Sequence, residues 1–303
     1  MTFTIIGPEA EAKLNWLALT DALVAGHSLP RAEVADTLLR QGGNTLLTRS
    51  AWIKGMGIAV KAATIYPDNP KAGLAAIHGA VNLLADQTGV LEALVDFTLV
   101  TKWKTAGDTL LAARRLARPD AERFLIVGAG AVARSMVDAY SAAFPSARFH
   151  VWTRNPEAAH TFAEKTGATP EPDLEQAVRH ADVIVTTTMA TSPLINGQWL
   201  RPGTHLDLIG AYRPDMREAD DSCFRRARVF VDARATTLHH IGELMTPLKA
   251  GVITEADVIA DFYDLPSGRF ARTSDDEITL CKNGGGAHLD LMTARYILQA
   301  ASG

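Results

Sequence analysis

The sequence predicts an α/β protein with two parts, a doubly wound parallel sheet domain and a discontinuous α+β domain. Three observations support this prediction. A glycine-rich turn joins a short apolar run to a helical pattern at residues 124–136, strands alternate with helices from residue 118 to about 285, and short β-type runs fill residues 44–99. The first two observations belong to one domain and the third to the other.

The glycine-rich turn has the sequence FLIVGAGAVARSM, from Phe124 to Met136. The apolar run predicts a strand, Gly128 permits the tight turn, and Gly130 carries no Cβ that would block an anion. The free N–H groups at the start of the next helix face that anion, which predicts a Rossmann-type turn holding a dinucleotide pyrophosphate at Gly128, Gly130, Ala131 and Val132. The alternative is a plain glycine-rich turn in some other α/β protein.

The choice of cofactor is predicted from the second strand, RFHVW, which ends in Thr153, Arg154 and Asn155. NAD sites usually place an acidic residue at this strand end, whereas NADP sites need room and positive charge for the 2′-phosphate. Because Thr153 is small and Arg154 follows it, NADPH is favoured and NADH is the second candidate. The alternative for Arg154 is a solvated surface side chain.

The alternation continues through the rest of residues 118–285, the predicted dinucleotide-binding domain. Helices are predicted at 158–166 and 173–180, and strands at 182–188, in THLDLIGA ending at Gly210, and in ARVFVDA ending at Asp232. No long linker or internal repeat interrupts the pattern. It is the pattern expected of a doubly wound sheet.

The other domain is assigned to residues 1–117 and 286–303. Helices are predicted from Glu9 to Ala25 and from Pro30 through Leu38, followed by an antiparallel sheet over residues 44–99. Residues 101–117 form a further helix, whose polar stripe contains Lys104 and Thr105. The tail KNGGGAHLDLMTARYIL ends in a helix that returns to this domain and makes it discontinuous.

Composition excludes several classes of protein. With 303 residues, 47% hydrophobic and 21% charged, the chain buries a sizeable core. A net charge of −4 gives no positive surface for binding nucleic acid or an anionic membrane.

The N-terminal sequence lacks the features of a signal peptide, so a cytoplasmic location is expected. Cys223 and Cys281 are predicted to be reduced structural thiols. No metal site is predicted, because HHIGE (His239 to Glu243) lacks the i, i+4 histidine pair.

Two lysines are the candidates for substrate binding and catalysis. Alternation in GIAVKAATI places Lys61 between Ala59 and Ala63, so it either extends from a sheet edge or points into a pocket with an anion. Lys104 lies on the polar stripe of the helix before the dinucleotide-binding domain. Two ammonium groups meeting one substrate carboxylate would each contribute up to roughly 4 kcal/mol at an effective dielectric near 20, before desolvation. Hydride transfer by a bound nicotinamide fits the absence of other catalytic motifs.

The chain resembles the ornithine cyclodeaminase and mu-crystallin family along almost its whole length. The motifs that carry the resemblance are GAGAVA, WKTAGDTLLAARRLA, GIAVKAATIYPDNP, PGTHLDLIGAYRPDMREAD and KNGGGAHLD. The resemblance implies a homodimer with the active site in a cleft between a substrate and dimerisation domain and a Rossmann domain. It further implies that Lys61 meets the substrate and that Thr105 lies near the cofactor phosphates. The nicotinamide side would be lined by Thr188, Met189, Gly210, Asn283 and Gly284.

Two departures from the family pattern direct the expected activity. Lys104 stands where the family usually has an arginine, so a carboxylate would meet a point charge and not a bidentate clamp. Tyr212 stands where cyclodeaminases carry an aspartate that activates the attacking group. The expected activity is therefore NAD(P)H-dependent reduction of a small cyclic imino acid, Δ1-pyrroline-2-carboxylate or Δ1-piperideine-2-carboxylate. The alternatives are ornithine cyclodeamination, an amino-acid dehydrogenase acting on a 2-oxo acid, and a non-enzymatic NADPH-regulated ligand-binding protein.

Overall fold

The computed structural model describes residues 3–302, which form two compact units. The first unit comprises Met1–Lys104 and Gly285–Gly303, and the second comprises Thr105–Gly284. The sequence placed the two boundaries at 117/118 and 285/286. The first boundary differs because a single helix runs through it. The roles assigned to the two units, substrate binding with dimerisation and dinucleotide binding, stay predictions.

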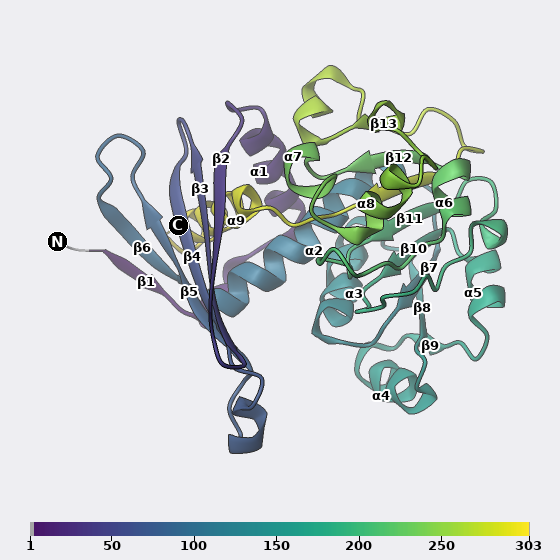
Figure 1. The fold of residues 1–303 in the computed structure, drawn as a ribbon, viewed down its shortest axis with the longest axis horizontal. Coiled ribbons are helices and arrows are strands. Elements are labelled where there is room, and N and C mark those ends of the chain that lie inside the picture. Colours follow the sequence, from purple (N-terminus) through teal and green to yellow (C-terminus); the bar gives the residue numbers. More distant parts are fainter. Residues whose placement is uncertain (1–2, 303) are drawn as a thin grey trace. The chain divides into compact units, whose positions relative to one another are not determined.

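The described part of the first unit contains a six-stranded sheet with the order β1-β6-β5-β4-β3-β2 (Figure 1). Its strands are β1 (Thr4–Ile6), β2 (Glu33–Gln41), β3 (Asn44–Ile53), β4 (Gly57–Ile65), β5 (Ile77–Leu84) and β6 (Leu91–Asp96). Strands β3 to β6 pair antiparallel, as the sequence predicted, β2 adds a further antiparallel strand beside β3, and β1 pairs parallel with β6. Helix α9 (Ala287–Ser302) packs along β3 and β4, so the C-terminal helix belongs to this unit.

The predicted helix from Pro30 through Leu38 is wrong. Residues Glu33–Gln41 form strand β2, which pairs with β3 over its whole length. Val34 and Leu38 misled the prediction because residues four apart lie on the same face in a helix and in a strand alike. The predicted N-terminal helix is divided into a 3₁₀ helix, η1 (Pro8–Lys13), and α1 (Trp16–His27), whose first turn is capped by the Asn15 side chain. A further 3₁₀ helix, η2 (Asn69–Ala72), lies between β4 and β5.

Helix α2 (Phe97–Leu116) begins four residues before the predicted start at Thr101. The FTLV run, predicted as the end of a strand, is its first turn, because the Asp96 carboxylate accepts a hydrogen bond from Leu99 N at 2.7 Å and caps the helix. The stripe predicted as polar is largely buried: Lys104 and Asp108 are 7% and 0% exposed. Buried charges in a helix need partners, so this stripe faces protein groups.

The second unit contains an eight-stranded sheet within the described chain, with the order β13-β12-β14-β11-β10-β7-β8-β9 and every pairing parallel. The strands are β7 (Arg123–Val127), β8 (Arg148–Trp152), β9 (Thr169–Pro170), β10 (Val183–Thr186), β11 (His205–Leu208), β12 (Arg228–Val231), β13 (Val258–Ala260) and β14 (Thr279–Lys282). The chain moves outward from β7 to β9 and then restarts on the other side at β10. This confirms the doubly wound prediction and puts the switch point between β7 and β10.

Helices connect these strands at most crossovers (Figure 1). They are α3 (Ala131–Ala143), α4 (Pro156–Thr166), α5 (Leu174–His180), η3 (Gly197–Trp199), α6 (Asp221–Arg226), α7 (Arg234–Thr237), α8 (Gly242–Lys249), η4 (Glu255–Asp257) and η5 (Phe262–Ser267). In α3, Met136 and Tyr140 are fully buried, whereas Val132 is 38% exposed beside the glycine-rich turn. Val132 therefore does not belong to the apolar face that its spacing suggested.

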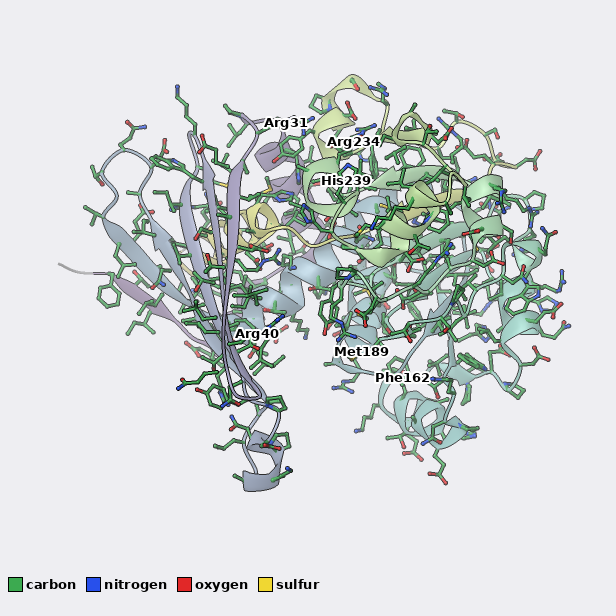
Figure 2. All side chains as sticks on the ribbon, viewed as in Figure 1. Arg31, Arg40, Phe162, Met189, Arg234 and His239 are labelled. Atoms are coloured by element: carbon green, nitrogen blue, oxygen red, sulfur yellow. The ribbon has the colours of Figure 1, made fainter. Side chains whose placement is uncertain are left out.

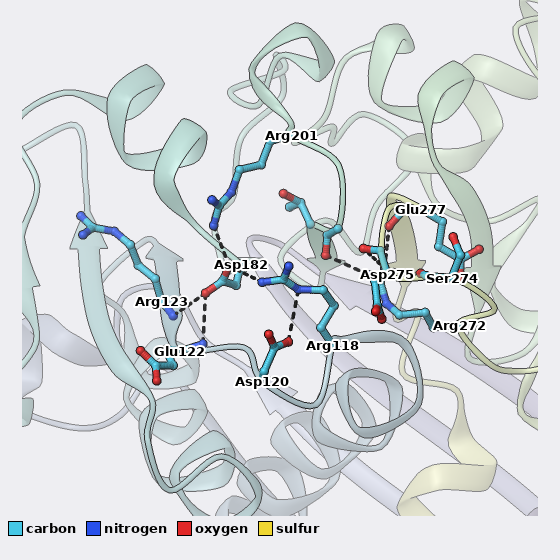
Figure 3. Close-up of polar contacts among 12 residues, drawn as sticks. Arg118, Asp120, Glu122, Arg123, Asp182, Arg201, Arg272, Ser274, Asp275 and Glu277 are labelled. Carbon is cyan, nitrogen blue, oxygen red and sulfur yellow. Dashed lines mark hydrogen bonds and ion pairs between the residues drawn. The ribbon is translucent and has the colours of Figure 1, made fainter.

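Asp182 ties the amino ends of β7 and β10 together (Figure 3). Its carboxylate accepts hydrogen bonds from the backbone N–H groups of Glu122 and Arg123, at 3.0 and 2.9 Å, and from the side chains of Arg118 and Arg201. One carboxylate beside the start of β10 thus satisfies two backbone N–H groups at the start of β7, at the end of the strands away from the glycine-rich turn. Among the described residues, no helix is both long and apolar enough to cross a membrane.

Candidate functional site

Lys61 points into the buried face of the first unit's sheet and not out from an edge. Strand β4 is paired on both sides, and alternate residues including Ala59, Lys61 and Ala63 are buried. The Lys61 ammonium donates to the Asp290 carboxylate at 2.9 Å and to the Thr101 hydroxyl at 2.8 Å. Asp290 is thus the anion that the sequence required for a lysine in a pocket.

Arg49 and Lys104 converge on one backbone carbonyl close to this ion pair. Arg49 lies directly opposite Lys61 in the β3–β4 register. Its Nη1 atom donates to Gly285 O at 2.8 Å, and Lys104 Nζ donates to the same oxygen at 3.2 Å. Gly285 has φ +67°, and a Cβ there would lie 2.7 Å from Lys104 Nζ. Position 285 therefore favours glycine for its backbone conformation, and a larger residue there would also displace the Lys104 ammonium.

We call Arg49, Lys61 and Lys104 the cation cluster. Arg49 also lies 4.0 Å from Asp290 and 3.0 Å from Asp36, so the cluster gathers three cationic side chains around the buried Asp290 carboxylate. Burial alone would raise the pKa of Asp290, but the charges of Lys61, Lys104 and Arg49 hold that pKa below its usual value. A group of cationic side chains of this kind suits a small anionic ligand.

His288 lies among the same groups and is fully buried. Burial lowers its pKa to about 3, the charges of Lys104 and Arg49 act in the same direction, and Asp290 opposes them. The imidazole is therefore neutral at any working pH. Neither the neutral His288 nor the ionised Asp290 is therefore a proton donor at the cluster.

The glycine-rich turn of the second unit has the geometry of an anion cradle. Gly128 has φ +114°, and a Cβ there would lie 2.5 Å from Thr187 Oγ1. Gly130 is the N-cap of α3 with no side-chain cap, and a Cβ there would meet no atom within 4 Å. The helix N-terminus is thus open to an anion, and a dinucleotide pyrophosphate fits this turn. Ala131 and Val132, which open α3, are exposed.

The end of β8 leads into a pocket of about 350 Å³. Thr153 is half-buried, Arg154 is exposed, and Asn155 caps α4 by accepting from Glu157 N at 3.1 Å. The pocket is lined by Ala129, Arg134, Asn155, Glu157, Ala158, Thr161, Phe162 and Lys165. Figure 2 labels Phe162, which lies on α4. Arg134 and Lys165 form no ion pair with any residue between 3 and 302, and both were missed in the sequence analysis.

The loops after β10 and β11 are joined by Glu218. Thr188 donates to it through its backbone N–H and its hydroxyl, and Gly210 through its N–H. Met189, labelled in Figure 2, is 64% exposed, and Tyr212 is 58% exposed. Glu218 lies within the motif PGTHLDLIGAYRPDMREAD, but the sequence assigned it no role, because its partners lie 8 and 30 residues away in the chain.

The remaining predicted site residues are Asn283 and Gly284, which follow β14, and Thr105, which lies in α2. Asn283 donates to Asp207 at 3.4 Å, and Gly284 N donates to Asp232 at 2.9 Å, so both are fixed at the carboxyl end of β14. Thr105 is half-buried within α2, where its carbonyl accepts from the Thr109 hydroxyl.

The histidine-rich stretch HHIGE does not form a cluster of ligands. His239 is exposed and pairs with Glu255 at 3.1 Å, whereas Glu243 is buried and accepts from backbone amides. Within the described chain, no three His, Cys, Asp or Glu side chains are placed to hold a metal ion. Cys223 and Cys281 are free and buried.

Arg49 and Asp290 are the residues of the cation cluster that sequence reasoning missed. Arg49 lies twelve residues before Lys61, and only the strand register brings the two side chains together. Asp290 belongs to the C-terminal helix, 229 residues from Lys61. The sequence indicated only that a buried lysine needs an anion. It did not identify which residue supplies that anion.

An open, fully parallel sheet with a glycine-rich turn beside its switch point defines the class of dinucleotide-binding α/β proteins. Residues 50–303 match the model of the ornithine cyclodeaminase/mu-crystallin family, and the chain belongs to that family. The predicted resemblance is therefore confirmed.

One similar protein and two similar solved structures follow. The Δ1-pyrroline-2-carboxylate reductase of Paracoccus denitrificans is 48% identical over 303 residues, which cover 97% of this chain and 96% of the relative. The structure of the Thermococcus litoralis Δ1-pyrroline-2-carboxylate reductase in complex with NADH and L-proline has a TM-score of 0.89 at 26% identity, covering 99% of this chain and 98% of the other. An archaeal alanine dehydrogenase dimer with bound NAD has a TM-score of 0.89 at 27% identity, covering 100% and 97%.

Proposed function

We propose that this protein is an NADPH-dependent reductase that converts a small cyclic imino acid, Δ1-pyrroline-2-carboxylate, into L-proline, with Δ1-piperideine-2-carboxylate as the six-membered alternative. The observation that carries the proposal is the cation cluster, which brings two buried lysines and an arginine together at one place, as binding of a small carboxylate requires. The similarity to the Paracoccus denitrificans and Thermococcus litoralis reductases supports the same substrate.

The cation cluster would bind and orient the substrate through its carboxylate. Lys61 and Lys104 are buried and belong to different elements, β4 and α2, so they approach a ligand from different directions. Arg49 adds a third positive charge. Its Nε and Nη2 atoms face Asp36 and its Nη1 atom donates to Gly285 O, so its proposed contribution is charge and not a bidentate clamp on the substrate.

When bound, the nicotinamide supplies a hydride to C2 of the imine. The chain's own residues would hold the cofactor at the glycine-rich turn, at Thr153 to Asn155, and at the loops containing Thr188, Met189 and Gly210, with Asn283 and Gly284 following β14. Thr105 would contact the phosphates. These assignments are part of the proposal.

The proton that completes amine formation must come from a group that is charged or solvated. His288 is neutral and Asp290 is ionised, so neither donates. Lys61, or a water that it orients, is the proposed donor, and Asp290 keeps the lysine fixed at 2.9 Å. Tyr212 stands where cyclodeaminases carry an aspartate, so the base for ornithine ring closure is missing.

A substrate panel tests the proposed activity directly. Purified protein should oxidise NADPH in the presence of Δ1-pyrroline-2-carboxylate, which absorbance at the reduced-nicotinamide band measures. Parallel reactions with Δ1-piperideine-2-carboxylate, with pyruvate plus ammonia, and with ornithine separate the alternatives. Ammonia release from ornithine without activity on either cyclic imine would show a cyclodeaminase instead, and no turnover of any compound would favour a ligand-binding role.

The pocket after β8 supports NADPH over NADH. Arg134 and Lys165 place two cations at this pocket, and Arg154 follows the end of β8. The adenosine ribose of the cofactor would bind at the end of this strand. Replacing Arg134 and Lys165 together by alanine should weaken NADPH binding by about tenfold or more and leave NADH binding within about twofold.

Fluorescence titration of the two reduced cofactors measures this selectivity. The matched control is Arg148→Ala together with Lys71→Ala, because both side chains are exposed and neither lines the pocket. Equal weakening of NADPH and NADH in the pocket variant would contradict a role in recognising the 2′-phosphate.

We also propose that the protein is a homodimer that works in the cytoplasm. The first unit's sheet exposes large apolar side chains on and around β2, including Val34, Leu38, Leu39 and Trp52. Exposed apolar side chains gathered on one sheet favour a protein interface. The archaeal alanine dehydrogenase described as a dimer supports a second copy of this chain as the partner.

A further inference from the structure

Glu218 is a fully buried carboxylate that collects four hydrogen bonds from two loops. Its Oε1 atom accepts from the N–H and the hydroxyl of Thr188, at 2.8 and 2.7 Å. Its Oε2 atom accepts from the N–H groups of Gly210 and Ala211, at 2.8 and 3.1 Å. One loop follows β10 and the other follows β11, so Glu218 joins the carboxyl ends of two neighbouring strands.

The two loops are packed too closely to move apart or together freely. A Cβ at position 210 would lie 2.2 Å from Thr188 O and 2.5 Å from Glu218 Oε1. Thr187, the residue before Thr188, donates its N–H to Val127 O at 2.9 Å, at the end of β7. A continuous set of contacts therefore runs from the glycine-rich turn through the loop after β10 to Glu218 and the loop after β11.

A second buried carboxylate holds Glu218 itself in place. Glu243 accepts from Glu218 N at 2.6 Å and from Ala219 N at 2.9 Å. Burial and the nearby charge of Glu218 raise the pKa of Glu243 to about 7, against the opposing effect of the Lys282 ammonium. Burying two carboxylates side by side costs folding free energy. We therefore interpret these hydrogen bonds as fixing the loop geometry more precisely than packing alone would.

The position of these loops relates them to one half of the cofactor. In an open parallel sheet, a dinucleotide lies across the carboxyl ends of the strands at the switch point, here between β7 and β10. The pocket beside α4 and the end of β8 lie on one side of that point, and β10 and β11 lie on the other. If the adenosine half occupies the β8 side, the nicotinamide half meets the loops that Glu218 joins.

We propose that Glu218 is a positioning residue that fixes the loops containing Thr188 and Gly210 in the arrangement that receives the nicotinamide ring. The inference rests on the proposed NADPH-dependent function. Glu218 touches neither substrate nor cofactor, and acts through the hydrogen bonds that it accepts.

The test replaces Glu218 by glutamine, which keeps its shape but turns one acceptor into a donor that faces backbone N–H groups. We expect E218Q to bind NADPH about tenfold more weakly, with a lower kcat, and to bind 2′,5′-ADP, the adenosine half alone, within about twofold of the unaltered protein. Both dissociation constants are measured by titration calorimetry. Loss confined to the whole dinucleotide is the signature of a misplaced nicotinamide side.

Asp182→Asn is the matched control, because Asp182 joins the same strand β10 to β7 through backbone N–H groups at the opposite edge of the sheet (Figure 3). It should lower Tm and leave both dissociation constants unchanged. If E218Q behaves like D182N, or weakens both ligands equally, the inference is overturned. If E218Q does not fold, Glu243→Gln is judged by the same criteria, since it loosens Glu218 without altering it. If the unaltered protein binds 2′,5′-ADP and NADPH equally poorly, the proposed cofactor fails and this inference fails with it.

Discussion

Replacing Lys61 by alanine is expected to lower kcat/KM for the cyclic imine by about three orders of magnitude, because the substrate carboxylate loses a buried cation. The dissociation constant for NADPH should stay unchanged, since the residues proposed to hold the cofactor lie elsewhere. Steady-state kinetics with Δ1-pyrroline-2-carboxylate and a fluorescence titration with NADPH measure the two effects separately.

A loss of stability would accompany this variant and must be separated from the loss of activity. Without Lys61, Asp290 is a buried carboxylate that keeps only the more distant charges of Arg49, 4.0 Å away, and Lys104, and such a broken pair costs about 3–5 kcal/mol of unfolding free energy. Adding Asp290→Asn removes the unpaired charge. The double variant should therefore recover much of its stability and remain inactive.

The matched control for Lys61 is Lys71→Ala. Lys71 also pairs with a carboxylate, Asp68 at 2.6 Å, but both side chains are about four-fifths exposed. Removing an exposed pair is expected to change the unfolding free energy by less than about 1 kcal/mol and the kinetics not at all. Activity close to that of the unaltered protein in K61A would remove Lys61 from the proposed mechanism.

Replacing Gly130 by aspartate is expected to abolish most NADPH binding while the fold stays intact. Gly130 has φ −79°, and a Cβ there meets no atom within 4 Å, so the new side chain fits the free protein. Aspartate at an N-cap stabilises a helix by about a few tenths of a kcal/mol relative to glycine. Its charge, however, would face the cofactor pyrophosphate, and like charges brought together cost several kcal/mol, so NADPH binding should weaken by more than about a hundredfold.

Gly130→Asn separates charge from shape, because asparagine has nearly the same size and also caps helices. It should weaken NADPH binding far less than aspartate does. Thermal unfolding of both variants in the absence of cofactor checks that Tm is not lowered. Tight NADPH binding by G130D would show that the pyrophosphate does not bind at this helix start.

Local sequence patterns were sufficient to predict most of the second unit. Each of its strands from β7 to β12, apart from the two-residue β9, and helices α3, α4 and α5 were predicted, because buried parallel strands are short apolar runs and Gly128 and Gly130 mark the turn. The first unit was predicted less well. Strand β2 was taken for a helix, since the spacing of Val34 and Leu38 suits both structures.

The sequence by itself determined the doubly wound sheet, the glycine-rich turn after β7, and the condition that Lys61 needs an anion if it is buried, because each follows from neighbouring residues. Only the tertiary structure decided which anion that is and which cation joins it: Asp290 comes from the C-terminal helix and Arg49 from the facing strand. The same holds for Glu218, whose four hydrogen bonds come from two loops. Strand register and long-range packing bring these groups together, and neither leaves a periodic signal in the chain.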